Sequence, residues 1–203
     1  AVNYALNIRG DGNRCAIADL DIVNPYFRTA DARDLLKKEG IRLIASEFAN
    51  SNLDMPTVAP EVMSVFCDDD GVVVFDVGGD EDGAFALGQY NRFLKDKNCR
   101  MYLVVNTKRP MTETADDLID MARVIEHASR LKFWGIVNNT NLGGITDEHT
   151  LMSDYAEIAE LSEKTGIPVV MHSGTQKALA GLGEKEKCLA FPMEIMISMP
   201  WQI

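Results

Sequence analysis

The sequence predicts an α/β fold in three layers, with a doubly wound, mostly parallel sheet between two layers of helices. Apolar runs and helix-like segments alternate along the chain. Each run is apolar at nearly every position, which is typical of strands covered by helices on both faces. No internal repeat, low-complexity tract or linker interrupts the alternation. Strand, helix and strand in succession predict right-handed crossovers between parallel strands.

The expected elements follow in chain order. The first is a helix, because Ala1, Val2, Ala5, Leu6 and Ile8 fall on one helical stripe. Strands are expected at the apolar runs 15–20, 41–45, 71–79, 100–107, 131–139 and 167–172. Helices are expected between them, at 83–96, 112–130 and 147–165, with weaker helical patterns near 30–39 and 58–66.

Length and charge narrow the class of protein. A chain of 203 residues that is 46% hydrophobic is long enough to form one large α/β domain with a core of its own. Its formal net charge of −11 disfavours nucleic acid and anionic membrane surfaces as partners. The apolar runs are all too short for a transmembrane segment. The widely spaced cysteines fit reduced thiols in a core better than disulfides, which predicts a cytoplasmic protein.

Polar residues follow the apolar runs at the points where strands are expected to end. In open parallel sheets, ligands bind outside the carboxyl ends of the strands, so these residues are the candidates for a site. Asp and Asn are also common turn formers, and each of them has that simpler interpretation. The candidates are Asp19 and Asp21, Asp76 with Gly78 and Gly79, the segment 106–110, and the segment 138–141.

These residue types fit phosphate and magnesium chemistry. Carboxylates at the ends of buried strands bind Mg²⁺ directly or through water. A glycine pair lets backbone N–H groups approach a phosphate closely. The histidines at 127, 149 and 172 lack metal-ligand spacing, so a surface or structural role is favoured for them.

Three segments carry a resemblance to a known family. The stretches ADLDIVNPYFRT, VVVFDVGGDEDGAFALG and GIVNNTNLG resemble the MinD/ParA/CobQ group of P-loop ATPases, in particular its uncharacterised ATP-binding members. The resemblance covers nearly the whole chain and implies a P-loop NTPase-like fold. It also implies ATP and Mg²⁺ as ligands, and ATP hydrolysis that switches conformation or dimerisation.

The resemblance implies a role for each candidate residue. Asp19 and Asp21 match the first switch, where a carboxylate positions the attacking water or a water on Mg²⁺. Asp76, also a candidate Mg²⁺ ligand, matches the acidic residue of the second phosphate motif. Gly79, next to Gly78, matches the glycine near the γ-phosphate. Asn139 matches the asparagine that contacts the adenine ring.

One part of the family pattern has no counterpart in this sequence. The phosphate loop GxxxxGK[ST] of such proteins opens a helix after a strand, and the motif does not occur in the 203 residues. We therefore expect residues 1–203 to be a single nucleotide-binding domain that lacks its first strand and phosphate loop. The resemblance also implies a homodimer and a protein client that the sequence does not identify. The alternative is a binding or scaffold protein that keeps the fold without catalysis.

Overall fold

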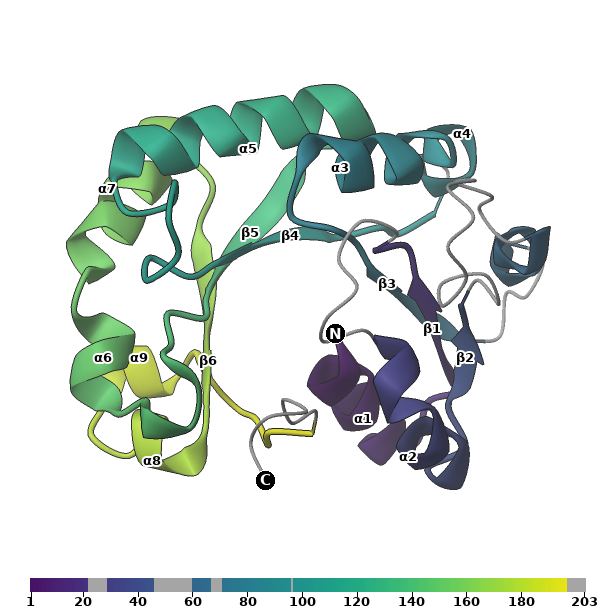
Figure 1. Ribbon diagram of the computed structural model, residues 1–203, viewed down its shortest axis with the longest axis horizontal. Helices are drawn as coiled ribbons and strands as arrows, with labels where there is room; N and C mark the ends of the chain where they lie inside the picture. The colour runs from purple at the N-terminus through teal and green to yellow at the C-terminus, as the bar shows by residue number, and fades with distance from the viewer. Residues whose placement is uncertain (22–28, 46–59, 67–70, 96, 197–203) are drawn as a thin grey trace. The chain divides into compact units, whose positions relative to one another are not determined.

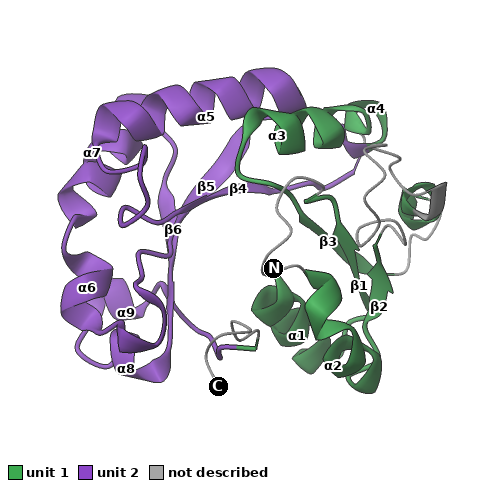
Figure 2. Ribbon diagram, in the orientation of Figure 1, with its two compact units in different colours: residues 1–93, 196–203 green, residues 94–195 purple. Residues whose placement is uncertain are grey.

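The computed structural model describes residues 1–21, 29–45, 60–66, 71–95 and 97–196. It divides into two compact units, which Figure 2 colours separately. Unit 1 comprises 1–93 and 196–203, and unit 2 comprises 94–195.

Unit 1 holds three parallel strands in the order β2-β1-β3 (Figure 1). Helical segments precede and follow each strand along the chain. Its elements are α1 (Val2–Gly10), β1 (Cys15–Asp19), η1 (Thr29–Ala32), α2 (Arg33–Lys38), β2 (Arg42–Ile44), η3 (Pro60–Phe66), β3 (Val72–Asp76), α3 (Glu81–Gly88) and α4 (Asn91–Leu94).

The core of unit 1 explains why these segments pack as they do. On one face of the sheet, Ile17 pairs laterally with Leu43 and Val74 and packs against buried residues of α1 and α2, including Ala5 and Leu36. On the other face, Phe75 stacks on Phe66 of η3 with ring centroids 5.9 Å apart, and Phe66 also stacks on Tyr90 and Phe93. Both faces of β3 therefore carry apolar contacts, as expected for a strand inside an α/β fold.

Unit 2 holds four parallel strands in the order β4-β5-β6-β7. Its elements are β4 (Met101–Val105), α5 (Ala115–Ser129), β5 (Phe133–Asn138), η4 (Gly143–Ile145), α6 (Glu148–Met152), α7 (Tyr155–Thr165), β6 (Val169–Gly174), α8 (Gln176–Leu179), α9 (Glu184–Lys187) and β7 (Ala190–Pro192).

Helices α5 and α7 cover one face of this second sheet (Figure 1). Leu103, Val105 and Ile136 from the strands meet buried residues of the two helices, such as Leu118 and Ile158. Apolar side chains also remain exposed in these strands: Val104 is 61% exposed and Trp134 is 44% exposed. These two apolar residues of β4 and β5 are therefore not fully covered.

Several boundaries differ from the sequence-based expectation, each for a local reason. The helix expected at 83–96 begins earlier, because the Asp80 side chain accepts from the Gly83 N–H at 2.8 Å, and it breaks into α3 and α4. The helix expected at 147–165 is two helices, α6 and α7, separated by a turn at Ser153 and Asp154. The strand β7 and the short helices α8 and α9 were not expected from the sequence.

Other expectations are confirmed. The opening helix is present as α1, and every described strand pairing is parallel. Of the three cysteines that the structure describes, Cys15 is a buried free thiol, whereas Cys99 and Cys188 are free but exposed, so among these three the expectation of core thiols holds only for Cys15. Cys67 lies outside the described residues. Among the residues that the structure describes, no helix has the length and apolar character to cross a membrane. Tyr26 and Phe27, the two aromatic residues of the stretch ADLDIVNPYFRT, lie outside the described residues.

Candidate functional site

Asp19 and Asp76 lie side by side at the carboxyl ends of two neighbouring strands. Asp19 is the last residue of β1 and Asp76 the last residue of β3, and the two are direct partners in the parallel register. The ladder continues one step further, because the Leu20 N–H donates to the Asp76 carbonyl at 2.7 Å. The strand pairing itself therefore places two carboxylates next to each other, both half-buried.

This placement changes the acidity of Asp19. Burial raises its pKa, and the neighbouring Asp76 carboxylate raises it further, to about 6. Backbone N–H groups of Asp21 and Ala30 donate to the Asp19 carboxylate and oppose that rise. At neutral pH the pair carries negative charge in a partly dehydrated place, an arrangement that a cation would stabilise.

Two further groups surround the pair. The Thr29 hydroxyl, buried with 1% of its surface exposed, donates to Oδ2 of Asp76. Asp21 lies against Gly78, because a Cβ built on Gly78 would come within 3.3 Å of Oδ1 of Asp21. Unit 1 therefore brings together Asp19, Asp21, Asp76 and Gly78.

The first turn of α3 fixes the backbone at Gly78. A Cβ on Gly83 would lie 2.6 Å from the Gly78 carbonyl oxygen and 2.8 Å from its nitrogen, so only glycine fits at position 83 without a backbone shift. Gly79, in contrast, is exposed, and a Cβ there would meet nothing within 4 Å. The backbone of Gly79 is therefore open to an approaching group, which is what a phosphate contact needs.

The strand ends of unit 2 carry amides that bond to one another. Oδ1 of Asn106, which follows β4, accepts from the N–H groups of Lys108 at 3.0 Å and Asn141 at 3.1 Å. The Asn141 amide donates to the carbonyl of Asn139 at 2.7 Å and to its Oδ1 at 3.3 Å. Nδ2 of Asn139 donates to the Ser173 hydroxyl at 3.0 Å. This network joins the loops after β4 and β5 to the carboxyl end of β6.

Asn139, the residue expected to contact adenine, keeps part of its hydrogen-bonding capacity. A primary amide has two N–H donors and two acceptor lone pairs. Nδ2 donates to both the hydroxyl and the carbonyl of Ser173, at 3.0 and 3.3 Å. Oδ1 accepts from Asn141 at 3.3 Å, which uses one of its two acceptor directions, and Asn139 is half-buried. Its neighbour Asn138 is fully buried and donates to the Leu151 carbonyl at 3.0 Å, a structural role.

Asp154 and His172 also lie near these strand ends, and the sequence did not predict a place for either of them there. Asp154 accepts from Lys108 Nζ at 2.7 Å and from the Thr107 hydroxyl at 2.9 Å, and these donors lower its pKa. His172 on β6 is fully buried, and within the described part of the chain its Nε2 has no hydrogen-bond partner. Burial lowers the pKa of His172, which therefore favours the neutral ring. This agrees with the structural role expected for it.

The predicted site residues thus fall into two groups. Asp19, Asp21, Asp76, Gly78 and Gly79 belong to unit 1, and Asn139 belongs to unit 2. Sequence reasoning missed Thr29, the last residue of the stretch ADLDIVNPYFRT, because the resemblance assigned roles only to Asp19 and Asp21 in that stretch.

The donors in unit 1 fit a hard divalent cation. Mg²⁺ in nucleotide-binding proteins is held by one or two carboxylates, with substrate phosphates and water completing its shell. Asp19 and Asp76 supply two such carboxylates from adjacent backbone positions. In the described ranges, no group of three or more His, Cys, Asp and Glu side chains is arranged to hold a metal ion. A cation at this pair would therefore depend on oxygen atoms from a bound phosphate.

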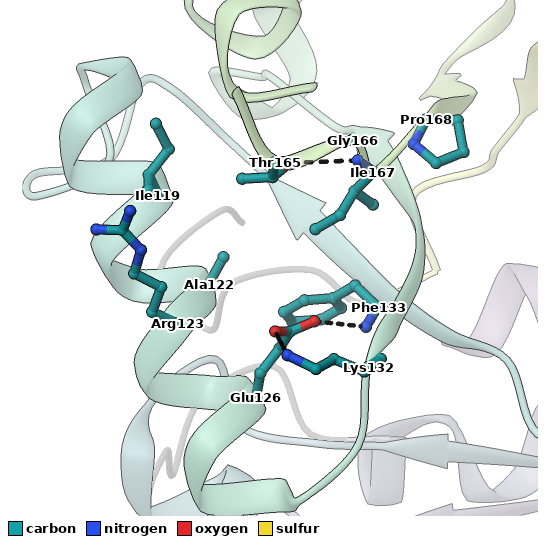
Figure 3. Close-up of a pocket in the computed structure, with 10 residues that line it drawn as sticks. All are labelled: Ile119, Ala122, Arg123, Glu126, Lys132, Phe133, Thr165, Gly166, Ile167 and Pro168. Carbon is teal, nitrogen blue, oxygen red and sulfur yellow. Dashed lines mark hydrogen bonds and ion pairs between the residues drawn. The ribbon is translucent and has the colours of Figure 1, made fainter. Parts of the chain in front are cut away.

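A depression of about 300 Å³ lies elsewhere in unit 2 (Figure 3). Phe133 at the start of β5 and Pro168 just before β6 line it, so it is at the amino ends of the strands. Glu126 accepts there from Lys132 and from the Phe133 N–H. No predicted site residue is among its lining residues, which are Ile119, Ala122, Arg123, Glu126, Lys132, Phe133, Thr165, Gly166, Ile167 and Pro168.

The parallel strands and their intervening helices are those of a three-layer α/β fold. A solved structure of similar fold is that of chloroplast FtsY from Physcomitrella patens, with a TM-score of 0.53 and 16% sequence identity. The match covers 91% of this chain and 55% of that chain, so the 203 residues correspond to about half of the FtsY structure. At this identity the likeness shows the fold alone. No protein-family model matches the sequence, and no curated protein matches it.

Proposed function

We propose that the chain is a nucleotide-binding protein of the MinD/ParA type that binds and hydrolyses ATP with Mg²⁺. The observation that carries the proposal is the register pairing of Asp19 and Asp76 at the carboxyl ends of adjacent parallel strands. This is the place where ligands bind in open α/β sheets, and the residue types suit a metal-bound phosphate. The fold shared with FtsY and the resemblance of three sequence segments to the MinD/ParA group support the same proposal.

Each candidate site residue of unit 1 has one role in this proposal. Asp76 and Asp19 hold Mg²⁺, which would neutralise charge on the phosphates when bound. Asp21 orients the attacking water, since its carboxylate lies beside Gly78 and is half-exposed. Gly78 and Gly79 present backbone N–H groups to the terminal phosphate. The resemblance gives Asn139 of unit 2 the contact with the adenine ring, for which its Oδ1 has a second acceptor direction beside the one that Asn141 uses.

A second candidate, a scaffold protein that binds without hydrolysis, is favoured by one observation. The motif GxxxxGK[ST] does not occur in these 203 residues, and phosphoryl transfer in this class of protein relies on its lysine. The two candidates differ in what they predict for the product of the full gene, which is therefore the protein to test.

The test is a titration of the full gene product with ATP and Mg²⁺, followed by steady-state turnover. We expect Asp76→Asn to weaken Mg²⁺-dependent ATP binding roughly tenfold or more, because it removes cation-binding charge. Asp21→Asn should spare binding and lower turnover by roughly 10²-fold, the usual size of a general-base or water-positioning effect. Glu81→Gln, at an exposed carboxylate in the first turn of α3, is the matched control.

The outcomes separate the two candidates. ATP binding without turnover would favour the scaffold protein. Equal ATP affinity in the parent and Asp76→Asn would contradict the cation site. In the same titration, Asn139→Ala should cost about 1 to 3 kcal/mol of ATP affinity and narrow the preference over GTP. Sedimentation with and without ATP tests the homodimer that the resemblance implies.

A further inference from the structure

The side chain of Thr29 reaches the proposed cation site from outside the two strands. Thr29 begins η1, the short helix that precedes α2, and only 1% of its surface is exposed. Its hydroxyl donates to Oδ2 of Asp76 on β3. The next residue, Ala30, donates its backbone N–H to the carboxylate of Asp19 on β1. One turn of η1 therefore supplies a hydrogen bond to each member of the carboxylate pair.

These two bonds have different chemical consequences. The bond from Ala30 comes from the backbone, so almost any residue at position 30 can make it. The bond from Thr29 depends on a side-chain hydroxyl, and a hydroxyl has a single proton to donate. A buried threonine that gives that proton to a carboxylate holds one of the carboxylate's two oxygens in a fixed direction.

The orientation matters because Asp19 and Asp76 repel each other. Two carboxylates in adjacent register positions lower their repulsion by turning apart, unless other groups hold them. The Thr29 bond to Oδ2 opposes that rotation at Asp76 and leaves the other oxygen for a ligand. We infer that Thr29 is a positioning residue, which holds the Asp76 carboxylate in the orientation that binds a divalent cation. The inference rests on the proposed function, since it concerns the same cation site.

The test measures cation binding directly. Mn²⁺ is the probe, because its free and bound forms differ in their electron paramagnetic resonance signal. The protein is the full gene product, measured with and without ATP. Thr29→Val keeps the branched shape and removes the donor, and it should weaken Mn²⁺ binding roughly tenfold, the typical effect of losing a hydrogen bond to a charged group. Thr29→Ser restores the hydroxyl and should bind Mn²⁺ within about twofold of the parent.

A matched control separates positioning from a general loss of stability. Thr165→Val removes another half-buried threonine hydroxyl, which donates to the Leu161 carbonyl at 2.7 Å in α7 of unit 2. It should leave Mn²⁺ affinity unchanged. The rise in thermal midpoint on adding Mn²⁺ is a second readout, because each variant is compared with its own metal-free form. If Thr29→Val does not fold, Thr29→Ala replaces it in the comparison with Thr29→Ser.

The outcomes distinguish this inference from the proposed function. If the parent binds Mn²⁺, Asp76→Asn does not, and Thr29→Val binds as the parent does, the positioning role is wrong and the cation site stands. If the parent shows no Mn²⁺ binding that depends on Asp76, the cation site is wrong and the role of Thr29 fails with it. Weak binding in Thr29→Val that Thr29→Ser restores supports both.

Discussion

The strand ends of the two units occupy equivalent places in their sheets and differ in chemistry. In unit 1 the strands end in two carboxylates, which repel each other and receive hydrogen bonds from Thr29 and Ala30. In unit 2 the strands end in neutral amides and hydroxyls, and Asn106, Asn139 and Asn141 bond to one another. Amides satisfy each other because each carries donors and acceptors, whereas ionised carboxylates carry acceptors only. The carboxylates of unit 1 thus leave room for a cation, whereas the amides of unit 2 largely satisfy one another.

The two units also differ in their expected response to acid. Unit 1 contains Asp19, whose pKa is raised, and unit 2 contains His172, whose pKa is lowered. Protonation neutralises a repelling carboxylate in the first case and creates a buried charge in the second. Mild acid should therefore stabilise one unit and destabilise the other. Hydrogen exchange of the β1 and β3 amides measures the stability of unit 1, and exchange of the β5 and β6 amides measures that of unit 2.

The largest effect is expected from Gly83→Ala. Glycine to alanine inside a helix ordinarily stabilises, but here the new Cβ would overlap the backbone of Gly78 at 2.6 to 2.8 Å. We expect a loss of about 3 kcal/mol in the free energy of unfolding of unit 1, with unit 2 unchanged. Gly79→Ala is the control, because its Cβ would meet nothing within 4 Å. An unchanged unit 1 in Gly83→Ala would mean that α3 does not pack on Gly78 as described.

A smaller effect of opposite sign is expected from Asp19→Asn. The pKa of Asp19 is about 6 in the folded protein and 3.8 for an ordinary aspartate, so the folded protein binds this proton more tightly than the unfolded chain does. Protonation of Asp19 therefore stabilises unit 1 fully below about pH 4, and this contribution is lost as the pH rises through 6. Asp19→Asn should raise the metal-free stability of unit 1 at pH 7 by about 1 to 2 kcal/mol, allowing for solvent screening, and should flatten its pH dependence.

The control for this variant is Glu39→Gln at the exposed end of α2, which should leave the pH dependence of unit 1 as in the parent. A drop in stability in Asp19→Asn at pH 7 would contradict the claim that the carboxylate pair is repulsive without a cation.

The smallest effect is expected at His172. Its ring lies between Asn138, whose Nδ2 is 3.4 Å from Nδ1, and Tyr155, whose ring centroid is 5.4 Å away. The negative charge of Glu186 in α9 raises the pKa of His172, but burial lowers it more. The unfolded chain therefore takes up the proton first, and unit 2 should lose stability as the pH falls below about 6.5. Unit 2 of His172→Gln should lack this dependence. His149→Gln, at an exposed histidine, is the control and should retain the dependence. If the stability of unit 2 in the parent does not change between pH 7 and pH 5, charging the buried ring carries no penalty.

The sequence predicted the strand ends better than the contacts around them. Asp19 and Asp76 follow apolar runs, and the rule that parallel strands end at one edge was enough to expect them together. Thr29 could not be found in this way, because the course of the chain between a strand and the next helix depends on tertiary packing. Strand β7 was missed because it is three residues long and ends in Pro192. The break between α6 and α7 has no proline or glycine to signal it. The single-domain expectation for residues 1–203 stays a prediction.

The register of β1 with β3 also has a consequence for how the protein folds. Asp19 and Asp76 come from distant parts of the sequence, and the pairing that joins them closes a long loop of intervening chain. Such closures are entropically costly and therefore slow. The two carboxylates meet only when that sheet is complete, so the folding chain is spared their repulsion until its hydrophobic contacts are in place. We therefore expect the candidate site to form in the same folding step that completes the sheet of unit 1.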